Sequence, residues 1–169
     1  MATLAGALGL TSTANPLVGN YAAHHAIFNF VLAYMALSAR TLKQKYKLDH
    51  NVNPREDVAR FGEKAVQDGK ITREQLNMVK RNEAAHANSM EHYTVFVASI
   101  LFATVAKVPN SSINRACTIY SVSRVAYGLA YIYITKYKWS YVRSTAWWSS
   151  NFCCFYLLWQ SAQRLSSSI

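Results

Sequence analysis

The sequence predicts an all-α integral membrane protein, folded as one bundle of four transmembrane helices. Hydrophobic residues make up 51% of the 169-residue chain and charged residues only 15%. All eight acidic residues lie between Asp49 and Glu91, so the rest of the chain contains long stretches with almost no charge. A helix needs ~20 consecutive, mostly apolar residues to cross a bilayer. The apolar content also excludes a disordered chain.

Four stretches are the candidate spans of a single membrane domain, residues 1–169. Residues 22–39 and 144–163 carry no formal charge, and residues 116–135 carry only Arg124. A soluble bundle would need charged outer faces on its helices, which the last stretch cannot supply. We therefore expect spans at about 20–40, 78–106, 115–135 and 143–165, with a cytosolic segment at 41–77.

The basic residues indicate how the chain is oriented. Residues 40–81 hold 11 of the 18 Lys and Arg, and residues 136–143 hold three more. Cytosolic loops collect Lys and Arg, so both segments are predicted to be cytosolic and both termini lumenal. This arrangement accounts for the net charge of +10 without a nucleic-acid partner, and no zinc, phosphate-loop or RNA-binding motif is present.

Turn and cap signals divide the cytosolic segment. Asn53-Pro54 and Asp68-Gly69 are turn dipeptides, and the proline can open a short helix. Thr72 and Gln75 have the spacing of a capping box, which predicts that a helix begins directly after Thr72. No Gly or Pro follows until Pro109, so we expect this helix to continue unbroken into the second span.

Glu91 is the most informative residue of the second span. By three- and four-residue spacing it shares one helix face with Lys80, Ala84, Ala87 and Asn88. An ionisable group inside a membrane is costly and needs a partner or a water-filled pocket. Arg124 of the third span is a candidate partner, either in a structural ion pair or in a polar crevice.

Other polar residues could complete such a crevice. Tyr127 and Tyr131 follow Arg124 on one stripe of the third span, while Arg143 and Ser144 open the fourth. A structural role also explains them, because tyrosines pack well near membrane interfaces and arginines anchor topology. If these four side chains line a crevice, the crevice would suit an anionic ligand. We expect no metal site, and interpret three residues as apolar packing groups: Cys117, Cys153 and Cys154.

Three motifs carry a resemblance to a known family. They are Asn53–Gly62 (NPREDVARFG), Ala85–Tyr93 (AHANSMEHY) and Ser123–Tyr131 (SRVAYGLAY). In this order they resemble the motifs of the membrane-associated proteins in eicosanoid and glutathione metabolism, the MAPEG family. The first motif is similar to the family's Asn-Pro-Glu-Asp segment with one residue inserted. The resemblance covers about residues 20–165.

The resemblance implies a homotrimer of four-helix bundles that binds glutathione at subunit interfaces and activates its thiol. Arg143 would then stabilise the thiolate and Ser144 could donate to it. Asp57 matches an acidic residue implicated in prostaglandin E synthase, and would act in catalysis. Glutathione would be bound by Arg40, Asn88, Glu91, Arg124, Tyr127 and Tyr131.

The chain departs from the family pattern at three positions. Ala84 and Ala87 stand where relatives have arginines that contact glutathione carboxylates, and Trp147 replaces a tyrosine. Losing a charged hydrogen bond costs ~1.5–3 kcal/mol. Lys80 or Arg81, about one turn earlier, could substitute for the missing guanidiniums.

These features support three functional hypotheses. The first is a glutathione-dependent transferase or isomerase of the endoplasmic reticulum membrane, acting on a lipophilic electrophile or peroxide. A guanidinium beside sulfur favours the thiolate, the nucleophilic form of a group with a pKa of ~8.5. The second is a family member that has lost glutathione and binds, isomerises or cyclises an apolar metabolite. The third is a non-enzymatic membrane scaffold.

Overall fold

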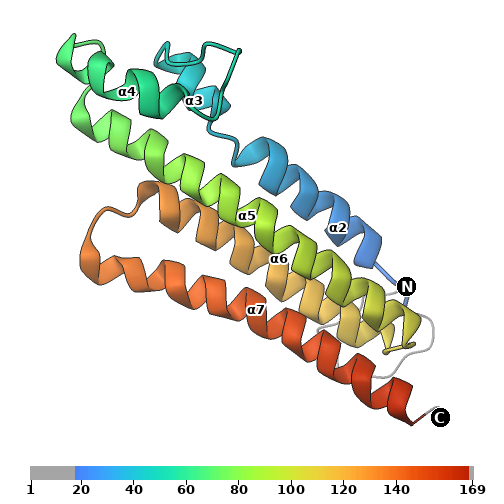
Figure 1. The fold of residues 1–169 in the computed structure, drawn as a ribbon. Helices are drawn as coiled ribbons and strands as arrows, with labels where there is room; N and C mark the ends of the chain where they lie inside the picture. The colour runs from blue at the N-terminus through green and yellow to red at the C-terminus, as the bar shows by residue number, and fades with distance from the viewer. Residues whose placement is uncertain (1–17, 168–169) are drawn as a thin grey trace.

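The computed structural model describes residues 18–167, which form a long bundle with a small helical cap at one end (Figure 1). The bundle is built from α2, a π-helical segment η1, and the long helices α5, α6 and α7. The cap contains α3 and α4. The bounds are α2 Ala22–Val31, η1 Leu32–Ala36, α3 Arg40–Lys45, α4 Asp57–Gln67, α5 Arg73–Val105, α6 Asn110–Tyr133 and α7 Tyr137–Ser166.

Helix α5 begins at the capping box that the sequence predicts. Thr72 Oγ1 accepts a hydrogen bond from Gln75 N at 3.1 Å, and Gln75 Oε1 accepts one from Thr72 N at 2.8 Å. The helix continues for 33 residues, and this confirms the prediction of one unbroken helix. Its first turns therefore lie beside the cap and its later turns run along the bundle (Figure 1).

The first helix of the bundle changes its winding before it ends. α2 continues directly into η1, where the backbone is π-helical from Leu32 to Ala36. Leu37 then packs against Gly128 of α6, where an added Cβ would lie only 2.7 Å from Leu37 Cδ2. Glycine therefore permits the close approach of α6 to the end of the first helix.

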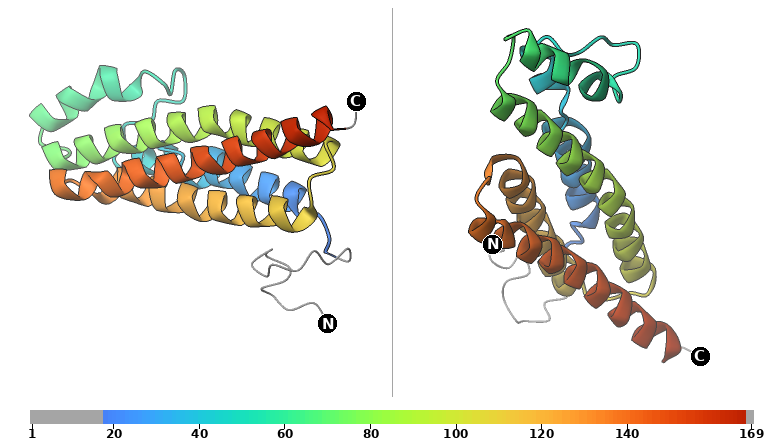
Figure 2. Two further views of the ribbon diagram at one scale, coloured as in Figure 1. Left: turned by 90° about the horizontal axis from the view of Figure 1, so that it is seen from below. Right: turned by 60° about the vertical axis from the view of Figure 1, so that its left-hand side comes forward.

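The bundle and the cap have separate apolar cores. In the bundle, α6 packs against α2, α5 and α7, and Figure 2 shows these four helices running alongside one another from two further directions. Its core includes Phe96, Ile113, Tyr120 and Leu157, together with the buried cysteines Cys117, Cys153 and Cys154. The cap core includes Leu48, Val58, Ile71, Leu76 and Val79.

Among the described residues, one helix is both long and apolar enough to cross a membrane. It is Ala22–Lys45, which takes in α2, η1 and α3, and its most apolar 18-residue stretch has a mean hydropathy of 1.3. The long helices α5, α6 and α7 do not reach that level. In α7 the reason is that an uncharged stretch is not necessarily apolar: Ser144–Gln163 contains serines, an asparagine and glutamines.

Candidate functional site

Two tyrosines, with an arginine stacked on each, lie in a row along the contact between α6 and α7. The Arg124 guanidinium lies over the ring of Tyr127, 4.4 Å from its centroid, and Arg143 lies over Tyr131 at 4.5 Å. The two tyrosine rings meet edge to face at 5.5 Å. Three of these residues occupy the single stripe of α6 that the sequence predicts, and Arg143 reaches the stripe from α7.

Arg124 is enclosed in the bundle. It is 2% exposed, and its Nη2 donates to Ser89 Oγ of α5 at 3.0 Å. Its Nη1 is buried without a hydrogen-bond partner. The adjoining void, which Asn29 and Tyr120 also line, measures only about 10 Å³. A space of this size holds no more than about one water molecule, so Arg124 has no room for a substrate.

The expected ion pair between Glu91 and Arg124 is not formed within the chain. Across residues 18–167, no carboxylate lies within ion-pair distance of Arg124, which contacts Ser89 and Tyr127 instead. Glu91 is exposed and lines a different cavity. The physical reason is helix phase: Ser89 and Glu91 differ by about 200° around α5.

Arg143 lines an open cavity of about 190 Å³. The other lining residues are Asn88, Tyr127, Ser144, Trp147 and Trp148, so no carboxylate borders it. In the described part of the chain, Arg143 has no ion-pair partner. The amide oxygen Asn88 Oδ1 is buried and accepts no hydrogen bond. The cavity thus offers an uncompensated cation, a hydroxyl and a free acceptor.

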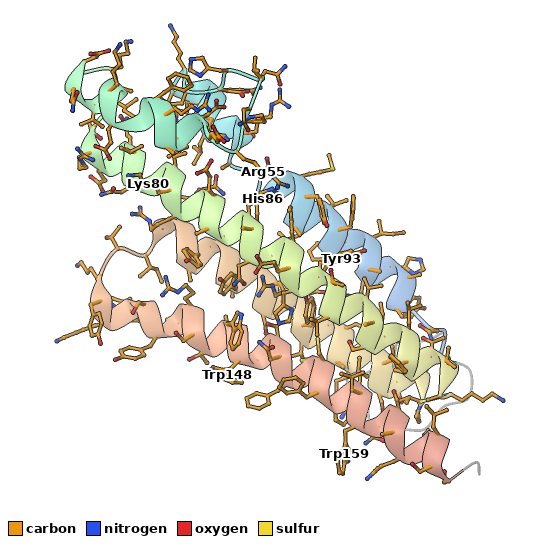
Figure 3. The ribbon with its side chains drawn as sticks, in the orientation of Figure 1. Arg55, Lys80, His86, Tyr93, Trp148 and Trp159 are labelled. Atoms are coloured by element: carbon orange, nitrogen blue, oxygen red, sulfur yellow. The ribbon has the colours of Figure 1, made fainter. Side chains whose placement is uncertain are left out.

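An apolar groove adjoins this cavity along the outer side of α6 and α7. It measures about 730 Å³, and Ile119, Phe152 and Tyr156 contribute to its wall. Ser144 and Trp148 line both the groove and the Arg143 cavity. Figure 3 shows Trp148 on α7, partway along the bundle. An apolar molecule in the groove could therefore reach the edge of the Arg143 cavity.

A second polar cavity, of about 520 Å³, lies where the cap meets α5. Charged residues form much of its wall. They are Arg40, Lys43, Arg55, Glu83 and Glu91, and His86, Ala87 and Met90 lie beside them. Asn88 and Glu91, three residues apart on α5, therefore line two different cavities of the same chain.

The structure brings only some of the predicted site residues together. Asn88, Tyr127, Arg143 and Ser144 share one cavity, with Tyr131 stacked against Arg143, whereas Arg40 and Glu91 share the other. Asp57 is 2% exposed in the cap, where it accepts a hydrogen bond from His50 N at 3.3 Å. It lines neither cavity, and its catalytic role stays a prediction.

The two cations expected to replace the missing arginines are held elsewhere. Lys80 Nζ donates to Glu63 at 3.0 Å, and Arg81 Nε donates to the carbonyl of Ile132 at 3.0 Å. Arg55 lines the second cavity but is not among the site residues that the sequence predicts. Its signal was the residue inserted into the first motif, which placed a cation in a loop before α4.

Comparison with known proteins gives one match. Residues 18–163 match the sequence model of the MAPEG family. No curated protein and no solved structure matches the chain.

Proposed function

The chain belongs to the MAPEG family, and from this we propose that it is a glutathione-dependent membrane transferase or isomerase. Its second substrate is a lipophilic electrophile or peroxide. This proposal extends the family relationship, which is consistent with such roles, to the residues of this chain.

The observation that carries the proposal is the uncompensated Arg143 guanidinium beside the Ser144 hydroxyl. A cation near sulfur favours the thiolate over the thiol and so raises the concentration of the nucleophile. The Tyr131 ring holds the guanidinium in place from one side. Arg143 would thus bind the glutathione sulfur, and Ser144 would donate a hydrogen bond to it.

The free oxygen of Asn88 supports glutathione as the ligand. Asn88 Oδ1 is a buried acceptor without a donor in this structure, and leaving such a group unpaired costs about 1–3 kcal/mol. The backbone amides of a peptide are suitable donors. The residues of the cavity therefore fit a small peptide thiol, for which glutathione would supply the nucleophilic sulfur.

The adjoining apolar groove supports a lipophilic second substrate. At about 730 Å³ it lies within the range of ~300–1,000 Å³ typical of small-molecule sites. Because Ser144 and Trp148 border both spaces, an electrophile in the groove would approach the thiolate without crossing water.

We propose that the working unit is a homotrimer in which a neighbouring protomer completes the site. The Arg143 cavity, at about 190 Å³, is smaller than sites that enclose a small molecule, ~300 Å³ or more. The remaining predicted ligands, Arg40 and Glu91, face a separate cavity. A second copy placed against α5 could join the two half-sites.

A membrane location fits the outer surface of the bundle. Large apolar side chains are exposed on it, and such patches mark contacts with lipid or protein. They include Ile27, Phe28, Leu101, Phe102, Val105, Phe152 and Trp159. We propose four spans in the endoplasmic reticulum membrane, with the basic cap in the cytosol and both termini lumenal.

A binding measurement tests the proposal directly. Detergent-purified protein is titrated with glutathione by calorimetry, while the ultraviolet absorbance of thiolate is recorded. We expect micromolar to low-millimolar binding and a thiolate signal. S-methylglutathione is the matched control, because it can bind but cannot ionise at sulfur. Absence of binding at millimolar glutathione would contradict the proposal.

Ala87 and Trp147 favour a second candidate function, a family member that binds an apolar metabolite without glutathione. Ala87 lines the cap cavity and Trp147 the Arg143 cavity, at positions where relatives have polar side chains. For this candidate, the same titration gives no heat with glutathione, whereas apolar ligands that enter the groove raise the unfolding temperature.

A further inference from the structure

Three cations and two carboxylates line the cavity between the cap and α5. Its wall includes Arg40 and Lys43 of α3, Arg55 of the following loop, and Glu83 and Glu91 of α5. Figure 3 shows Arg55 close to His86, at the point where this loop meets α5. At about 520 Å³ the space is large enough for part of a small peptide.

Two of the three cations are already engaged. Arg40 Nε lies 3.3 Å from Asp49 Oδ2, and its Nη2 donates to Asn51 Oδ1 at 2.6 Å. Lys43 Nζ lies 3.1 Å from Glu83 and also donates to the carbonyl of Pro54. These contacts compensate the charge of both residues within the protein.

Arg55 and Glu91 are the groups that remain. Within residues 18–167, neither side chain forms a hydrogen bond or an ion pair, although both line the cavity. One free guanidinium and one free carboxylate around the same space are complementary to a group that carries both charges. A free α-amino acid head, with its carboxylate and ammonium on one carbon, is such a group.

We propose that Arg55 is the residue that recognises the α-carboxylate of the γ-glutamyl group, with Glu91 binding the adjacent ammonium. This inference rests on the proposed use of glutathione. It also explains how the chain tolerates Ala84 and Ala87, since the inserted Arg55 brings a guanidinium from the loop to the cavity that Ala87 lines. In this chain the guanidinium that recognises the carboxylate would lie in a loop, whereas in relatives it lies on a helix.

Arg60 provides a matched control for Arg55. It lies on α4 in the same cap, is paired with Glu56 at 2.5 Å, and does not line the cavity. Arg55→Gln and Arg60→Gln remove the same charge from the same region. General electrostatic attraction of glutathione to a basic cap would be weakened equally by both, whereas a direct contact would be lost only in Arg55→Gln.

The experiment measures affinity by calorimetry on the full-length protein in detergent, with three ligands. They are glutathione, an analogue that lacks the γ-glutamyl α-carboxylate, and an analogue with its glycine carboxylate amidated. We expect Arg55→Gln to weaken binding of glutathione and of the glycine amide by roughly 10- to 150-fold. It should not weaken binding of the decarboxylated analogue. Arg55→Lys should recover part of the affinity, and Arg60→Gln should retain it.

The outcomes separate this inference from the proposed function. If the unmodified protein binds glutathione and Arg55→Gln binds it equally well, the assignment of Arg55 is wrong and the proposed function stands. If Arg55→Gln weakened binding of glutathione and of the decarboxylated analogue equally, the assignment of Arg55 would also be wrong. Arg55 would then contact a group other than the α-carboxylate. If the unmodified protein binds no glutathione, both proposals are wrong. Thermal unfolding of each variant verifies that the cap remains folded.

Discussion

The cap and the bundle use arginine in opposite ways. In the cap and the first turn of α5, surface guanidiniums other than Arg55 pair with carboxylates: Arg73 with Glu63 at 2.6 Å and Arg60 with Glu56 at 2.5 Å. In the bundle, Arg124 and Arg143 meet aromatic rings and neutral polar groups, and no carboxylate. Exposed pairs contribute little to stability and leave no charge for a ligand, whereas an unpaired cation is either structurally important or available for binding.

The bundle itself contains both cases. Arg124 is enclosed and bonded to Ser89, so its charge is used between helices. Arg143 is half-buried at an open cavity, so its charge is available to a ligand. The difference lies in access to solvent and not in the chemistry of the side chain. Four predictions test this division, from the largest expected effect to the smallest.

Replacing Arg143 should have the largest effect, and on activity. We expect Arg143→Ala to lower kcat/KM for glutathione conjugation of an aryl halide by about 100- to 1,000-fold, the usual effect of removing one electrostatic stabiliser. Its thiolate absorbance should disappear, while the unfolding temperature changes little. Arg164→Ala, an exposed arginine near the other end of α7, is the matched control. Conjugation that persists in Arg143→Ala would show that another group activates the thiol.

Replacing Arg124 should mainly affect folding. Arg124→Ala removes a large buried side chain and leaves Ser89 without its donor, so we expect a loss of about 2–4 kcal/mol. Arg124→Met retains most of the volume and removes an incompletely bonded charge, and should cost less. Unfolding temperatures in detergent measure both. Suppose instead that Arg124→Ala is as stable as the unmodified protein but no longer binds glutathione. Arg124 would then be a ligand-binding residue like Arg143, and not a structural one.

Disrupting the contact between α6 and the end of the first helix should have an intermediate effect on stability. In Gly128→Ala the new methyl group would lie 2.7 Å from Leu37 Cδ2, and overpacking of this kind costs about 1–3 kcal/mol. In a Leu37→Ala background the same substitution should cost little. A double-mutant cycle of unfolding temperatures measures this coupling. Equal costs in both backgrounds would show that the two residues do not meet.

Removing an ion pair of the cap should have the smallest effect. Hydrogen bonds from Arg73 and then Lys80 hold the pKa of Glu63 below its usual value near 4.5. The folded-state pKa is therefore lower than the unfolded one, so the stabilisation is present above the unfolded pKa and is lost as pH falls through the folded pKa. Glu63→Gln should lower the unfolding temperature slightly at neutral pH.

A pH series checks the sign of that effect. The difference in unfolding temperature between Glu63→Gln and the unmodified protein should shrink as pH falls through the folded-state pKa, because the carboxyl then becomes protonated in both states. Glu74→Gln, an exposed carboxylate at the start of α5, is a suitable control. A Glu63→Gln effect as large as that of Arg124→Ala would contradict the contrast between cap and bundle.

Local signals in the sequence predicted several elements well. The capping box at Thr72 and the absence of Gly and Pro through Val105 specify α5, because helix initiation and continuation depend on neighbouring residues. The stripe that joins Arg124, Tyr127 and Tyr131 was predictable for the same reason, since spacing along one helix fixes which side chains share a face. The absence of charge was a poorer guide to membrane spans, because the uncharged stretch of α7 is not apolar enough to count as one.

The sequence by itself determined that acids are confined to residues 49–91, and therefore that the arginines of α6 and α7 have no carboxylate on their own helices. Only the tertiary structure decided that Arg124 contacts Ser89 while Glu91 lines another cavity, and that Arg55 joins Glu91 there. The rotation of α5 against α6, and the path of the loop before α4, decide these contacts. Both depend on packing between segments far apart in the chain, which spacing along one helix does not specify.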